Sequence, residues 1–145
     1  RPEDINIEIP ISNRAEELIY YQFNDSALNG FSAKISEKRN EHNRYKIISK
    51  IPIKTEKLSV VLNQYIPKSK IIDFMTIDAE GLDYDVLISN DWYRFRPKVL
   101  VVEDMLIDHW EDIENSRIYK FLTTKNYSLY SKLFRSFIYV DRDFI

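Results

Sequence analysis

Three carboxylates, Asp78, Glu80 and Glu103, stand directly after two short apolar runs, residues 71–77 and 97–102. A short apolar run of this length is typical of a strand that is buried on both faces. Strands of that kind form parallel sheets that helices cover. Ligands of such open sheets bind outside the carboxyl ends of the strands. We therefore expect the three carboxylates at a ligand-binding edge of a sheet.

A carboxylate in that place can orient a hydroxyl group and remove its proton. Asp78 is the first candidate for this role; the alternative is an acid that caps the next helix through the backbone N–H groups after Gly81. Because one residue separates Asp78 from Glu80, an extended backbone would point both carboxylates the same way. Such a pair can bind two hydroxyls or a divalent cation, but no other sequence signal supports a metal and none is predicted. Glu103 is expected to face the same crevice.

The composition indicates a globular protein. The chain has 145 residues, 44% of them hydrophobic and 14% aromatic, which suffices for a single domain with a core. The net charge of -2 argues against a nucleic-acid partner. No segment has the length of a membrane-spanning helix or the pattern of a secretory signal, so no membrane partner is expected. The absence of cysteine is compatible with a cytoplasmic location, which we expect.

Glycine is scarce in this chain, with Gly30 and Gly81 as its two examples. A nucleotide-type cofactor loop needs several glycines close together, and the chain has no such loop. The chain also begins with Arg1 rather than Met, in a segment that has the pattern of a strand. From the missing glycine-rich loop and the missing initiator Met, we expect this chain to be a piece of a longer protein.

The elements that must position the carboxylates follow from periodicity. Alternating residues predict a half-buried strand over 5–11, and Thr55 is the expected N-cap of an amphipathic helix over 56–66 that Pro67 ends. Before that helix we expect a strand at 18–23, a polar loop at 24–30, a weak helix or mobile loop at 31–44 and an extended segment at 45–55.

The second half contains the two apolar runs. A helix over about 82–90 between strands 71–77 and 97–102 predicts a parallel crossover. A helix at about 113–125 follows, ended by Asn126 in the left-handed conformation. Strands at 127–134 and 137–142 complete an antiparallel hairpin. The predicted fold is α/β, a partial doubly wound sheet that is mostly parallel and ends in this hairpin.

Residues 76–81, 85–87 and 96–103 also occur in an order and spacing that resembles the FkbM family of S-adenosylmethionine-dependent methyltransferases. These segments read Thr-Ile-Asp-Ala-Glu-Gly, Asp-Val-Leu and Arg-Pro-Lys-Val-Leu-Val-Val-Glu. The polar loop at 23–29 and the segment from Lys125 into the hairpin are similar to the family as well. Two features differ: Leu82 stands where members often have His or Tyr, and the glycine-rich first half of the family fold has no counterpart.

The resemblance implies a Rossmann-like class I methyltransferase fold, with S-adenosylmethionine as the cofactor of the complete protein. It implies methyl transfer to a hydroxyl of a saccharide or natural-product-like acceptor. Within that chemistry Asp78, Glu80 and Glu103 are the candidate catalytic residues. The resemblance also places Ser12 and Asn13 beside the adenine end of the cofactor.

The polar loop offers further candidates. Asn24, Ser26 and Asn29 could hydrogen-bond a hydroxylated acceptor such as a glycan, although polar loops are common without a ligand. The alternative to a catalytic protein is a non-catalytic binding or oligomerisation module derived from the methyltransferase fold. In that case the missing strands would leave an exposed sheet edge through which two copies form a homodimer.

Overall fold

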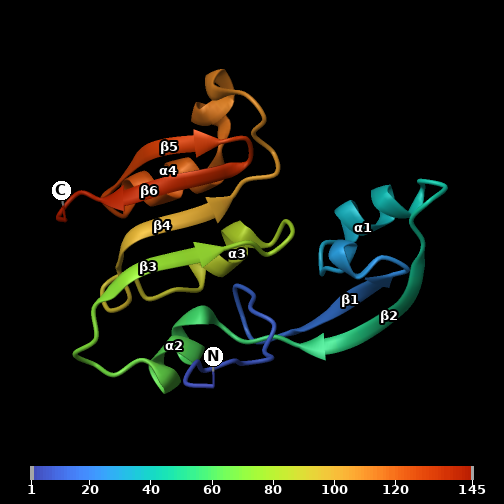
Figure 1. Cartoon of the computed structure of the whole chain (residues 1–145), viewed down its shortest axis with the longest axis horizontal. Coiled ribbons are helices and arrows are strands. Elements are labelled where there is room, and N and C mark those ends of the chain that lie inside the picture. The colour runs from blue at the N-terminus through green and yellow to red at the C-terminus, as the bar shows by residue number, and fades with distance from the viewer. Residues whose placement is uncertain (1, 145) are drawn as a thin grey trace.

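The computed structural model describes residues 2–144, which form a two-stranded and a four-stranded sheet (Figure 1). The small sheet pairs β1 (Glu17–Phe23) with β2 (Ile47–Lys54) in antiparallel orientation. The large sheet has the order β3-β4-β6-β5. Its strands are β3 (Ile72–Ile77), β4 (Pro97–Glu103), β5 (Tyr127–Leu133) and β6 (Ser136–Asp141).

The large sheet is mixed. β3 and β4 are parallel, as the crossover pattern predicts, whereas β4 pairs with β6 and β6 with β5 in antiparallel orientation. The prediction of a mostly parallel sheet is therefore wrong. The reason is that the C-terminal hairpin, itself predicted correctly, places β6 directly beside β4.

The helices are short. The α-helices are α1 (Ala33–Asn40), α2 (Leu58–Tyr65), α3 (Asp83–Ile88) and α4 (Arg117–Thr124), and the 3-10 helices are η1 (Ser26–Leu28) and η2 (Trp110–Asn115). In Figure 1, α3 and α4 lie behind the large sheet, and within residues 2–144 its front face carries no helix. These residues therefore do not by themselves form the predicted doubly wound arrangement. None of the helices in the described part of the chain combines the length and apolar character that a membrane crossing requires.

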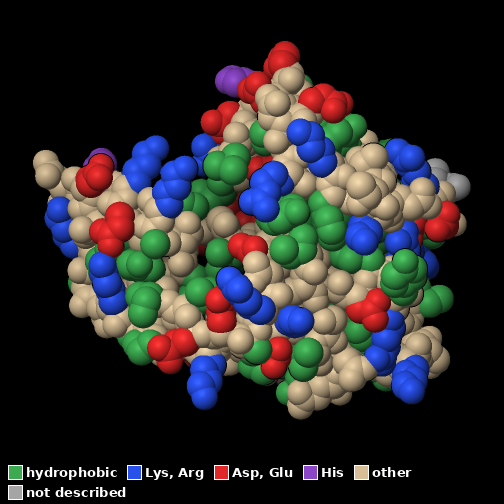
Figure 2. All heavy atoms as spheres, turned by 180° about the vertical axis from the view of Figure 1, so that it is seen from behind, with side chains coloured by type: hydrophobic (Ala, Val, Ile, Leu, Met, Phe, Trp, Pro, Cys, Tyr) green, Lys and Arg blue, Asp and Glu red, His purple; other side chains and the backbone are tan. Residues whose placement is uncertain are grey.

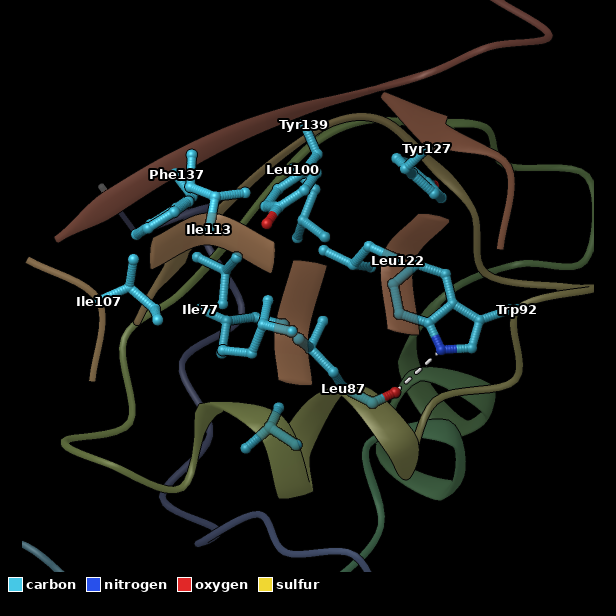
Figure 3. Close-up of a cluster of buried hydrophobic side chains, with 13 residues drawn as sticks. Ile77, Leu87, Trp92, Leu100, Ile107, Ile113, Leu122, Tyr127, Phe137 and Tyr139 are labelled. Atoms are coloured by element: carbon cyan, nitrogen blue, oxygen red, sulfur yellow. Dashed lines mark hydrogen bonds between the residues drawn. The ribbon is translucent and has the colours of Figure 1, made fainter. Parts of the chain in front are cut away.

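The main core lies between the large sheet and these two helices (Figure 3). Leu100 of β4 and Tyr139 of β6 meet Leu87 of α3 and Leu122 of α4, and all four side chains are fully buried. Each contributes about 1.5–3 kcal/mol by its burial. The indole Nε1 of Trp92 donates to the backbone oxygen of Leu87 at 2.9 Å. This packing holds the carboxyl ends of β3 and β4 in place.

Within the described residues, strand β3 is one of the two outer strands of the large sheet, and it is less buried than its sequence predicts. Phe74 is 58% exposed and the preceding Ile71 is 64% exposed. The predicted burial on both faces fits β4 better than β3. Strand β4 lies inside the sheet, with β3 and β6 as its neighbours. The exposed edge that we expect is present at β3; its pairing with a second copy remains a prediction.

Two predictions for the first half are wrong. Residues 5–10 form no strand, Ile5 is 66% exposed, and Ile11 makes a single bridge to Glu56, because no described strand lies alongside to pair this backbone. Thr55 is not the N-cap of α2, which is Lys57. Instead the buried Thr55 hydroxyl donates to the backbone oxygen of Arg14 at 3.0 Å and ties that turn to β2. Asn126 ends α4 with φ 67°, as predicted.

Candidate active site

The turn after β3 has an unusual backbone. Glu80 and Gly81 both have positive φ, at 49° and 96°. The carboxylate of Asp83, in the first turn of α3, accepts hydrogen bonds from the backbone N–H groups of Ala79 (2.8 Å) and Gly81 (3.1 Å). Asp83 therefore holds this turn, and the alternative that Asp78 caps the helix is wrong. The side chain of Asp78 remains exposed at the end of β3.

Asp78, Asp83 and Glu103 form a group of acids at the carboxyl ends of β3 and β4. One carboxylate oxygen of each lies within 4.8 Å of those of the other two. Burial, followed by the charges of Asp78, Asp83 and Glu80, raises the pKa of Glu103 to about 7, against the opposing effect of Arg135. Burial likewise raises the pKa of Asp83. Oε2 of Glu103 is buried and has no hydrogen-bond partner within the described residues.

Glu80 does not belong to this group. Its carboxylate accepts a 2.8 Å hydrogen bond from Nη2 of Arg39 in α1. The backbone between Asp78 and Glu80 is not extended as expected, because Glu80 has a positive φ, although both residues line one cavity. The ion pair joins α1 to the turn. A side chain at Gly81 would crowd α1 and strain the turn, since a Cβ there would lie 2.4 Å from Cδ1 of Ile35 and the φ of 96° disfavours other residues.

A cavity of about 540 Å³ opens beside the turn, a size ordinary for small-molecule sites. Asp78 and Glu80 contribute its acidic side, and Figure 2 shows acidic side chains in the hollow between the β1–β2 unit and the large sheet. The rest of the lining is mainly apolar and includes Tyr20, Phe31, Leu58, Leu62, Met75 and Ile77. The arrangement can bind a molecule with one polar and one apolar side.

The predicted acceptor-binding residues separate into two groups. Asn29 lines the cavity, and its Oδ1 accepts from the backbone N–H of Phe23 at 2.8 Å. Asn24 and Ser26 are not among the described residues that line it. The Asn24 side chain instead bonds the backbone of Arg44 (3.0 Å) and Lys46 (2.9 Å), closing the end of the small sheet.

Ser12 and Asn13 both make contacts within the protein. The Ser12 side chain is buried, and its hydroxyl donates to Glu16 at 3.4 Å. Nδ2 of Asn13 donates to Asp85 of α3 at 2.8 Å, while its Oδ1 is buried without a partner among the described residues. Asn13 thus offers one unsatisfied acceptor close to α3.

The oxygens of the acidic group are of the kind that Mg²⁺ and Ca²⁺ prefer. Both oxygens of Asp83, however, already accept backbone hydrogen bonds. Carboxyl groups this close share protons readily, because ionising both of two neighbouring carboxyls would bring two negative charges together. The geometry therefore favours acid–base chemistry over cation binding.

Sequence reasoning missed Asp83 and Arg39. Asp83 was detectable, since acids in the first turn of a helix commonly bind free backbone N–H groups. Arg39 carried no signal, because its contact with Glu80 spans 41 positions and depends on how α1 folds over the turn.

Comparison with known proteins gives one match. The family model described as the methyltransferase FkbM domain matches residues 1–129, which is most of the chain. No curated protein and no solved structure matches the chain.

Proposed function

The chain belongs to the FkbM family of methyltransferases, and from this premise we propose that it forms the acceptor side of an enzyme that methylates a hydroxyl group. The observation that carries the proposal is the acidic group at the ends of β3 and β4. Glu103 combines an unpartnered buried oxygen with a pKa raised to about 7. A carboxyl group with that pKa can accept a proton at neutral pH and is more basic than an ordinary glutamate.

The proposed division of labour follows from exposure. Asp78 is exposed at the end of β3 and holds the acceptor by accepting a hydrogen bond from a hydroxyl next to the one that is methylated. Glu103 takes the proton of the reacting hydroxyl at Oε2 as that oxygen becomes nucleophilic. Glu80 acts indirectly, because its ion pair with Arg39 keeps the turn and the cavity wall in position. Of the three predicted catalytic residues, we therefore retain Asp78 and Glu103 for the chemistry and assign positioning to Glu80.

S-adenosylmethionine, when bound, supplies an electrophilic methyl group. One observation fits part of this cofactor: the unpartnered Oδ1 of Asn13 can accept from an amino or hydroxyl group such as those of adenosine. The Ser12 hydroxyl is already used by Glu16 and fits less well. With Gly30 and Gly81 as its two glycines, the chain supplies no glycine-rich cradle. We propose that other residues of the complete protein supply it, covering the open face and edge of the large sheet.

The acceptor class follows from the cavity. Its acidic side suits hydroxyl groups, and its apolar side suits the carbon skeleton of a saccharide or a natural-product-like compound.

The test replaces the acids in the complete protein and measures methyl transfer from radiolabelled S-adenosylmethionine. We expect Glu103→Gln to lower kcat by roughly 10²–10⁴-fold, since this is the usual contribution of a general base. Asp78→Asn is expected to weaken acceptor binding and turnover together. In the wild type, the rate is expected to rise with pH through about 7, as Glu103 loses its proton.

Asp73→Asn is the matched control. Asp73 lies on the same strand β3, but its carboxylate pairs with Lys98 at 2.7 Å and is exposed. Its replacement is expected to leave turnover unchanged. A Glu103→Gln variant that turns over at the wild-type rate would refute the role of Glu103 as base.

A further inference from the structure

Two aromatic side chains form part of the cavity wall. The ring centroids of Tyr20 and Phe31 lie 4.9 Å apart, with the ring planes tilted by 44°. Both residues line the cavity together with Asn29, Asp78 and Glu80. Aromatic rings and carboxylates therefore line the same cavity, a combination that the proposed chemistry does not by itself require.

The backbone explains why these two residues meet. Tyr21 and Gly30 form an antiparallel bridge, with N–H···O distances of 2.9 and 3.2 Å. In an antiparallel bridge the flanking positions also lie opposite each other, which places Phe31 beside Tyr20. Ser32 then caps α1 through its hydroxyl, which fixes the chain directly after Phe31. The pair is thus held by backbone hydrogen bonds rather than by deep burial.

The chemistry of the pair is specific. The face of an aromatic ring carries partial negative charge and attracts the weakly positive hydrogens of C–H groups. A pyranoside presents an apolar face of C–H groups and carries hydroxyls around its rim. A carboxylate and an amide that line the same cavity can bind those hydroxyls.

We propose that Tyr20 and Phe31 hold the apolar face of a pyranoside acceptor while Asp78 and Asn29 bind its hydroxyls. This inference rests on the proposed function, since it names the acceptor whose hydroxyl that function methylates. It names a substrate class and two residues that determine specificity.

Two other occupants fit less well. An apolar ring without hydroxyls would remove the Asp78 carboxylate from water and give it no hydrogen-bond donor, which sites of this kind strongly disfavour. The planar base of adenosine has no slot between the two rings, because they already contact each other at 4.9 Å. A pyranoside needs only one open ring face and several hydroxyl acceptors.

The test measures binding without methyl transfer. Saturation-transfer-difference NMR on the full chain uses methyl β-D-glucopyranoside as the probe, with cyclohexanol and adenosine as comparison ligands. We expect binding of the glycoside, with the strongest signals on its ring C–H groups, and weaker or no binding of the other two.

Variants of the two aromatic residues separate the effect of the ring from the effect of side-chain volume. Tyr20→Leu and Phe31→Leu keep an apolar side chain but remove the ring, and each is expected to weaken glycoside binding about three- to tenfold. Tyr20→Phe retains the ring and is expected to bind like the wild type. Tyr93→Leu is the control, because Tyr93 is fully exposed and does not line the cavity. Amide NMR spectra check that each variant is folded.

Three results would overturn the inference: no glycoside binding by the wild type, unchanged binding in both leucine variants, or preferred binding of adenosine. Failure of the proposed function looks different. In that case Glu103→Gln retains methyl transfer, whatever the glycoside measurements show.

Discussion

The two ends of strand β4 are built in opposite ways. At the start of the strand, Arg96 makes two hydrogen bonds to Asp141 (3.0 and 2.7 Å) and a third to the backbone oxygen of Lys125 (3.0 Å). The hydroxyl of Tyr127 donates to the backbone oxygen of Pro97 at 2.6 Å. At the other end, Glu103 lies among acids and keeps an unpartnered oxygen.

The difference separates stability from chemistry. At the Pro97 end each charge has an opposite partner, and Asp141 raises the pKa of Arg96 above its usual value. At the Glu103 end a carboxyl is partly buried among like charges; burial first, and then these charges, raise its pKa and cost folding free energy. Proteins accept such local costs mainly at functional sites. Strand β4 therefore begins in a stabilising ion pair and ends in a group of acids suited to proton transfer.

The largest effect on stability is expected from breaking the supporting end. Arg96→Met removes the partner of Asp141, whose side chain is 10% exposed, and leaves a nearly buried carboxylate unpaired. We expect a loss of about 2–4 kcal/mol in the free energy of unfolding, measured by urea denaturation.

Lys98→Met provides the control on the same strand. Lys98 pairs with Asp73, which is 75% exposed, and exposed pairs contribute little to stability. Its urea midpoint is expected to stay close to that of the wild type. Equal losses in the two variants would contradict the special status of the Arg96–Asp141 pair.

A smaller change of opposite sign is expected at the other end. Folding raises the pKa of Glu103 from 4.5 to about 7, so the folded state favours the protonated form. Stability from this group is present below pH 4.5 and is lost as the pH rises through about 7. Glu103→Gln removes the charge and is expected to stabilise the protein at pH 8 by about 1–2 kcal/mol, discounted for partial exposure.

Near pH 4 the wild type and Glu103→Gln are expected to have similar stability, because both are then neutral at this position. Glu111→Gln, an exposed acid of η2, controls for the loss of one negative charge. A Glu103→Gln variant that is destabilised at pH 8 would show that the charged carboxylate is held favourably, against this account.

Local patterns predicted much of the fold. Periodicity in the sequence predicted the two strands β3 and β4, the helix between them and the terminal hairpin. The strand expected at 5–11 failed because a strand also needs a pairing neighbour, which alternation of residues does not reveal. The prediction of a mostly parallel sheet failed for the same reason, since the pairing of β6 with β4 is a tertiary property.

The position of the acidic group was predicted, but its membership was not. Strand ends placed Asp78 and Glu103 together, as the parallel register of β3 and β4 requires. The positive φ of Glu80 was not predictable, because non-glycine residues seldom adopt it. It redirects Glu80 to Arg39, while Asp83 takes its place among the acids. The aromatic pair depends on the bridge between Tyr21 and Gly30, which no local pattern indicates.

The raised pKa of Glu103 is the central claim, and it can be measured directly. A ¹³C NMR titration of the glutamate side-chain carboxyls would follow Glu103, with its resonance assigned by the Glu103→Gln variant. The account predicts a midpoint of about 7. A midpoint near the ordinary value of 4.5 would show that burial and the neighbouring acids do not act on Glu103 as described, and would contradict its proposed role as base.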